Sequence, residues 1–135
     1  MRQTFKVLGM VFVMILLSSS VALAASSASI TGTNGDDQIK GTSKAEEIAG
    51  LKGDDEITDG LGADAVYGGS GADNLIGYGG DTSVDHFYGG ADRDTIQSRD
   101  IPAVKDYVDC GSGVDRVYAD KADVISSNCE RVSMR

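Results

Sequence analysis

The segment Gly68-Gly69-Ser70-Gly71-Ala72-Asp73-Asn74-Leu75-Ile76 contains the unit that repeats through most of the chain. Six residues of the form G-G-x-G-x-D precede three of the form x-apolar-x. Glycine allows positive φ and close backbone approach, which favours a turn, and the three-residue pattern favours a short strand with its middle side chain facing inward. A helix is excluded, because each of the many glycines would cost about 1 kcal/mol there.

Large apolar residues recur at a fixed spacing in the 135-residue sequence, which is typical of a repeat architecture. The spacing is nine up to Leu75, and twelve-residue steps lead to Phe87 and Val108. The inward-facing residues are Ile30, Ile39, Ile48, Ile57, Val66, Leu75, Phe87, Ile96, Val108 and Val117. Two turns and two strands close one coil, and each coil contacts only its neighbours. We therefore predict an all-β fold, a parallel β-roll solenoid of nine-residue Gly/Asp repeats with two short-stranded parallel sheets.

An acidic residue stands two positions before each of these apolar residues from Ile39 onward. Alternate turns must lie on the same side of the roll, so the acidic residues form two groups. The first side comprises the turns that end at Asp37, Asp55, Asp73, Asp94 and Asp115. The second side comprises the turns that end at Glu46, Asp64, Asp85 and Asp106.

Stacked turns of this kind favour calcium. Carboxylates about 5 Å apart repel one another without a counter-ion. Ca²⁺ accepts six to eight oxygen ligands in flexible geometry, whereas Mg²⁺ demands an octahedron and keeps its water. Zinc is disfavoured because the chain has one His and both Cys are expected to be oxidised. A solvated turn is the alternative for a single Gly/Asp motif, but nine motifs in phase favour several calcium ions.

The repeat resembles the haemolysin-type, or repeats-in-toxin, calcium-binding β-roll, whose unit is G-G-x-G-x-D-x-U-x. The resemblance covers about residues 30–132, and it implies ions in the turns, held by the sixth-position carboxylate and by backbone carbonyls. The end of the chain is also similar to that of small exported, stand-alone proteins of this type. The residues thereby assigned to metal binding are Gly35, Asp37, Gly53, Asp55, Gly62, Asp64, Gly68, Gly69, Gly71, Asp73, Asp85, Gly89, Gly90, Asp94, Gly113 and Asp115.

The turns of the two sides differ in sequence. On the first side, Asp92 replaces the fourth-position glycine once. On the second side, Lys44 occupies a glycine position, and both twelve-residue repeats carry their extra residues there, at Thr82-Ser83-Val84 and around 99–104. We expect a regular metal ladder on the first side, and a weaker, partial ladder with two stacked protruding loops on the second.

The first 24 residues are typical of a signal peptide. Arg2 and Lys6 precede an apolar run, and Ala22-Leu23-Ala24 supplies a small-residue cleavage site. The run is shorter than the roughly 20 residues of a membrane span. We expect a short lead over 25–29, the roll with its C-terminal cap over 30–135, and a secreted or extracellular protein, with the cell surface or periplasm as alternatives. An uncleaved anchor is the alternative for the signal peptide.

The charge balance narrows the choice of partners. Without Arg2 and Lys6, 10 basic residues face 21 acidic ones, so the net charge changes from −9 to −11. Such a chain does not suit nucleic acid or an anionic membrane, and we expect no membrane span after cleavage of the signal peptide. It suits a cation.

Cys110 and Cys129 are 19 residues apart, close to the length of one coil. This separation should bring them together on adjacent layers, and export favours oxidation. We expect a disulfide that caps the C-terminal end. A redox role is the alternative, but the chain has no C-x-x-C motif.

Tyr67, His86, Tyr88 and Tyr107 should project outward from one sheet. They could pack across exposed strands or form a docking face for a sugar or a protein. The sequence has no H-E-x-x-H or G-x-S-x-G motif, so we predict no enzymatic activity. The leading function is a calcium-binding structural or interaction module. The alternatives are a glycan or protein recognition module that uses the long loops or the Tyr face, and a solenoid enzyme that modifies polysaccharides.

Overall fold

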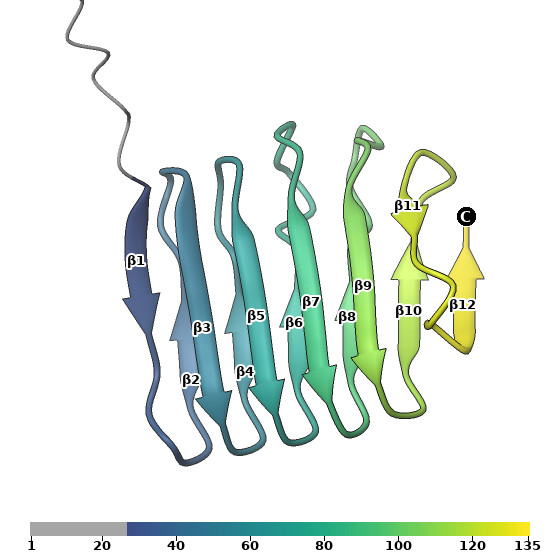
Figure 1. Ribbon diagram of the computed structural model, residues 1–135. Helices are drawn as coiled ribbons and strands as arrows, with labels where there is room; N and C mark the ends of the chain where they lie inside the picture. The colour runs from purple at the N-terminus through teal and green to yellow at the C-terminus, as the bar shows by residue number, and fades with distance from the viewer. Residues whose placement is uncertain (1–26) are drawn as a thin grey trace, which may run out of the picture.

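The computed structural model describes residues 27–135, and the signal peptide expected over residues 1–24 lies outside them. The chain alternates between two six-stranded parallel sheets, whose strands lie side by side in Figure 1. The odd sheet contains β1 (Ala28–Thr31), β3 (Glu46–Lys52), β5 (Ala65–Ser70), β7 (His86–Ala91), β9 (Tyr107–Ser112) and β11 (Val124–Ile125). The even sheet contains β2 (Gln38–Lys40), β4 (Glu56–Thr58), β6 (Asn74–Ile76), β8 (Thr95–Gln97), β10 (Arg116–Ala119) and β12 (Arg131–Met134). The predicted parallel β-roll is confirmed.

The core is a thin layer of apolar side chains between the two sheets. Each coil contributes one residue from each sheet, and the parallel register aligns them along the roll. The predicted inward residues from Ile39 to Val117 are all buried. Ile30, in the first strand, is partly buried and packs against them. The nine-residue spacing therefore identified the core correctly.

Most odd-sheet strands are longer than the three residues predicted from the repeat. β3 has seven residues, and β5, β7 and β9 have six each. Their extra residues open the first-side turn and stay paired, as in the register Gly69↔Gly90↔Gly111. Gly90 has φ 116°, a conformation that favours glycine. The turn therefore bends only after its first glycines have joined the sheet.

The two twelve-residue repeats place their extra residues in the loops between β6 and β7 and between β8 and β9. Both loops lie on the second side, as predicted, and Figure 1 shows them at the same end of the strands. The strands on either side of the loop between β6 and β7 keep their register, since Asn74 pairs with Thr95 and Ala65 pairs with His86. The inserted residues therefore change the loops and not the sheets.

A disulfide between Cys110 and Cys129 joins β9 to the segment before β12, with a Cα–Cα distance of 5.2 Å. The predicted pairing near the C-terminal end is confirmed. Within residues 27–135, no helix is long and apolar enough to cross a membrane.

Candidate metal centre

On the first side, the carboxylate of each coil accepts a hydrogen bond from the backbone of the preceding coil. Asp55 Oδ1 accepts from the Asp37 N–H at 2.8 Å, and Asp73 Oδ1 accepts from the Asp55 N–H at 2.9 Å. The ladder continues through Asp94 and Asp115 at 2.9 and 2.8 Å. Glu130 ends it by accepting from the Asp115 N–H at 2.8 Å. One oxygen of each carboxylate is thereby fixed in place.

The second oxygen of these carboxylates is buried and lacks a partner. Within residues 27–135, no group donates a hydrogen bond to Oδ2 of Asp55, Asp73, Asp94 or Asp115. Burial disfavours the charged form, and neighbouring carboxylates add to this effect, so the pKa of Asp94 rises to about 7 and the pKa of Asp73 to about 6, although hydrogen bonds oppose the change. Because an unpaired buried carboxylate is costly, these oxygens are suited to a cation.

The first glycine of the turns that end at Asp55, Asp73 and Asp94 lets such an oxygen come close to the backbone, because a side chain there would collide with it. A Cβ built on Gly89 would lie 2.6 Å from Asp94 Oδ2 and 2.6 Å from the Cys110 carbonyl oxygen. Gly50 and Gly68 have the same kind of surroundings, a carboxylate of their own turn and a carbonyl of the next coil. At each of these glycines the two nearest atoms are oxygens, and oxygen is the ligand element that calcium prefers.

The second side carries the same hydrogen-bond ladder. Asp64 Oδ1 accepts from the Glu46 N–H at 2.7 Å, and Asp85 Oδ1 accepts from the Asp64 N–H at 2.8 Å. Asp106 and Asp123 continue it at 2.9 and 3.0 Å. These hydrogen bonds are unbroken, and the weaker metal ladder expected on this side stays a prediction. The parallel sheets set the distance between coils, so the loop insertions do not interrupt the hydrogen bonds.

Asp59 makes the second side different from the first. It occupies the position where most turns have their first glycine. Ligand oxygens of Asp59, Asp64 and Asp85 lie within 4.8 Å of one another, and all three residues are buried. Asp59 Oδ1 accepts from the N–H groups of Gly60 and Tyr78, at 2.6 and 2.8 Å. Among the described residues, these three are the only such group of potential metal ligands.

The electrostatics of this group also favour a cation. Oδ2 of both Asp59 and Asp64 is buried with no partner in the described part of the chain. Burial, followed by the nearby Asp85 carboxylate, raises the pKa of Asp59 to about 8. Burial likewise raises the pKa of Asp64 to about 7. A divalent cation would supply the positive charge that this group lacks.

The glycines predicted to form the metal sites have different roles. Positive φ is found at Gly53, Gly62, Gly69, Gly71, Gly90 and Gly113. Gly68 and Gly89 instead border the oxygen-lined spaces. Gly35 lies in the exposed turn of the first coil. In that coil Asp37 is satisfied within its own turn, because its Oδ2 accepts from the Thr33 N–H at 2.6 Å.

Three carboxylates of the site were not identified from the sequence. Asp59 could have been found because it interrupts the glycine pattern. Asp123 and Glu130 follow Asp106 and Asp115 by 17 and 15 residues, so they fall outside the repeat spacing. The last coil is shorter than the others, and only its three-dimensional path shows that these residues end the two ladders.

The predicted aromatic residues stack in pairs on the odd sheet. The ring centroids of Tyr67 and Tyr88 are 4.7 Å apart, and those of His86 and Tyr107 are 4.8 Å apart. The planes within each pair differ by 6° and 7°. These rings therefore pack across neighbouring strands, and the docking role of this face stays a prediction.

Comparison with known proteins agrees with this geometry. The family model of the RTX calcium-binding nonapeptide repeat (4 copies) matches residues 29–43, 41–75 and 79–100. No curated protein and no solved structure matches the chain. Repeats of this kind imply calcium binding and a β-roll, are typical of exported proteins and are generally structural. From its matched repeats and its oxygen-lined turns, the chain belongs to the RTX calcium-binding nonapeptide repeat family.

Proposed function

We propose that this protein is an exported β-roll that folds when several calcium ions bind and then acts outside the cell as a structural or interaction module, without catalysis. The observation that carries the proposal is the row of buried carboxylate oxygens that have no partner among residues 27–135. The carboxylates at the sixth position of each turn and the turn carbonyls would hold the ions. The predicted signal peptide and the disulfide support an oxidising, extracytoplasmic location.

The thin core explains why calcium would control folding. Ordering each residue costs roughly 1.5 kcal/mol, and about ten aliphatic or aromatic side chains do not offset this cost alone. Without an ion, the buried carboxylates add a further penalty. The free energy of metal binding then becomes free energy of folding. Weak, cooperative binding, at about 10⁻⁴ to 10⁻³ M, is typical of extracellular modules and would let the chain fold after export.

The test is circular dichroism of residues 25–135 during calcium titration, with the disulfide intact. We expect a largely unfolded spectrum in excess chelator and a β-rich spectrum in millimolar calcium, with magnesium as the matched control ion. The protein should regain its chelated spectrum when the calcium is removed again. A β-rich spectrum that persists in excess chelator would contradict calcium-dependent folding.

The aromatic stacks favour a second candidate, calcium-dependent recognition of a glycan or a protein through the odd sheet. Tyr67 and Tyr107 are exposed and belong to different stacks. A hollow of about 340 Å³ adjoins Tyr107, and ligand sites usually combine aromatic walls with a few polar groups. A glycan array and a protein pull-down, each with and without calcium, would test this role.

A further inference from the structure

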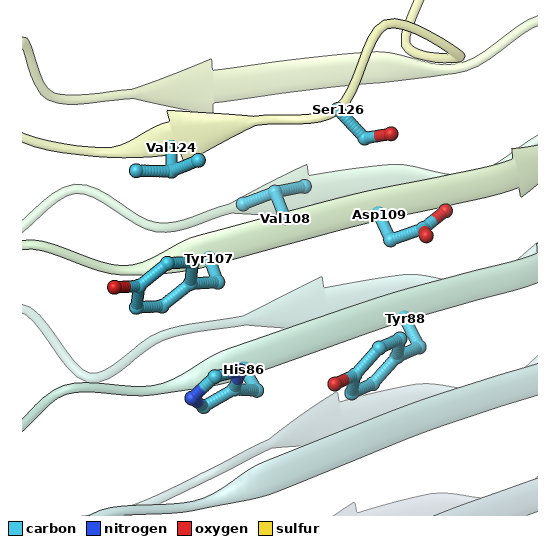
Figure 2. A pocket seen from close by; sticks show the side chains of 7 residues that line it. All are labelled: His86, Tyr88, Tyr107, Val108, Asp109, Val124 and Ser126. Carbon is cyan, nitrogen blue, oxygen red and sulfur yellow. The ribbon is translucent and has the colours of Figure 1, made fainter.

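A hollow on the outer face of the odd sheet lies beside the aromatic stacks (Figure 2). Tyr88 and Tyr107 line it from strands β7 and β9, and Val124 and Ser126 line it from the last coil. Asp109 also lines the hollow, on the same strand as Tyr107. The site therefore combines ring surfaces, a hydroxyl and a carboxylate.

The register of the strands explains why the hollow exists. Tyr67, Tyr88 and Asp109 occupy equivalent positions on three neighbouring strands. One face of the Tyr88 ring is covered by Tyr67, at a centroid distance of 4.7 Å. On the other side the next position holds Asp109, whose shorter side chain does not continue the stack. The hollow thus lies where a third flat group would stack on Tyr88.

The Asp109 carboxylate is held in a fixed position at this place. Its Oδ1 accepts from Asn128 Nδ2 at 2.7 Å and from the Gly111 N–H at 3.0 Å. Its Oδ2 receives no hydrogen bond from the residues that the structure describes. A ligand with N–H donors would therefore find an oriented acceptor there.

The chemistry of these groups favours a flat cation over a neutral ligand. Guanidinium groups are planar, stack on aromatic rings and pair with carboxylates. The protein already places cations over its own rings, since Lys105 Nζ is 4.9 Å from the Tyr107 centroid and Arg99 Cζ is 5.1 Å from that of Tyr118. Lys105 does not line the hollow. The chain also has a net charge of −9, which favours a basic partner.

We propose that the hollow binds the guanidinium group of an arginine side chain from a basic segment of a partner protein. The group stacks on the open face of Tyr88 and pairs with Asp109. This inference rests on the recognition role proposed above, because it names the partner chemistry of that surface. It also requires the calcium-bound roll, which brings Tyr88 and Asp109 onto adjacent strands.

The test is an NMR titration of calcium-loaded residues 25–135, labelled at tyrosine, with Nα-acetylarginine amide. We expect saturable shifts of the Tyr88 resonances and binding at least about fivefold tighter than that of Nα-acetyllysine amide, which lacks the planar group. Tyr88→Ala should abolish binding. Tyr67→Ala is the matched control, because that ring covers the far face of Tyr88, and it should retain most of the affinity. Asp109→Asn should weaken binding by about fivefold or more.

Circular dichroism of each titrated sample separates the outcomes. A protein that does not fold with calcium contradicts the proposed function itself. A folded protein that shows no saturable arginine binding overturns the arginine site, as does equal loss of binding in Tyr67→Ala and Tyr88→Ala. Binding of methyl glucoside that depends on Tyr88, without any effect of the arginine amide, would also overturn it and would favour a glycan.

Discussion

The two sides of the roll carry hydrogen-bond ladders of the same kind, but the free carboxylate oxygens have different surroundings on each side. On the first side, the free oxygens of Asp55, Asp73 and Asp94 each lie near a glycine and a carbonyl of the next coil. On the second side, Asp59 replaces such a glycine and brings a third carboxylate to Asp64 and Asp85. The sheets therefore determine the spacing of each ladder, whereas the residue at the start of each turn determines the local charge.

The second-side loops also contribute buried carboxylates. Asp81 Oδ2 accepts from the Gly62 N–H at 2.7 Å, and Asp120 Oδ2 accepts from the Asp100 N–H at 2.7 Å. Burial raises the pKa of Asp100 to about 6, and its Oδ2 has no partner in the described part of the chain. The second-side loops therefore add acidic groups to this side, and the weaker metal ladder expected there stays a prediction.

The largest difference is expected between Asp73→Ala and Glu46→Ala. Asp73 lies in the middle of the first-side ladder, and its loss leaves the buried Asp55 N–H unpaired, at a cost of about 1–3 kcal/mol before any ion is lost. Among residues 27–135, no earlier coil donates to Glu46, whose carboxylate accepts from Thr42 in its own turn. Asp73→Ala should therefore raise the calcium midpoint of folding far more, as followed by circular dichroism. Equal shifts would show that the ladders do not hold the ions as proposed.

A smaller effect is expected for Asp59→Asn, which keeps the shape of the side chain and removes its charge. Ligand charge tunes calcium affinity, so the midpoint should rise by roughly threefold. Glu47→Gln is the matched control, since it removes one charge from an exposed residue of the adjacent coil. Calorimetric calcium titration of the two variants distinguishes direct binding of an ion by Asp59 from a general change in repulsion between acidic residues. Identical calcium isotherms would mean that Asp59 is not a ligand.

The effect of pH on folding should change sign with the ion. In the ion-free fold, burial raises the pKa of Asp59 to about 8 and of Asp94 to about 7, far above the ordinary value of 3.8. The folded state therefore binds more protons than the unfolded state between about pH 4 and 8, so its stability falls as pH rises through this range. In chelator, β-structure should be greater at pH 5 than at pH 8.

Calcium should reverse this dependence, because protons and calcium compete for the same oxygens. The calcium midpoint of folding should be higher at pH 5 than at pH 8, as measured by titration at constant ionic strength. In Asp59→Asn the change of midpoint with pH should be smaller than in the original protein. A midpoint that does not change with pH would argue against carboxylate ligands with raised pKa values.

The sequence predicted the core and the pairing of strands, because each nine-residue unit adds one inward residue such as Leu75 or Ile96. It also predicted the Cys110–Cys129 disulfide, since 19 residues span about one coil. It did not predict Glu130 and Asp123 as the ends of the ladders, because the last coil departs from the period. The hollow was missed for a similar reason: the repeat places Asp109 in line with Tyr67 and Tyr88, but it does not place Val124 and Ser126 of the last coil, which also line the hollow.

The two ladders have a direction. In every link, the N–H group of one coil donates to the carboxylate of the coil that follows it. A stack that loses its first coil exposes carboxylate acceptors at its new end, whereas a stack that loses its last coil exposes N–H donors. Shortening the protein from its two ends is therefore not equivalent. The coil that carries Asp123 and Glu130 supplies the acceptors for the last donors of both ladders.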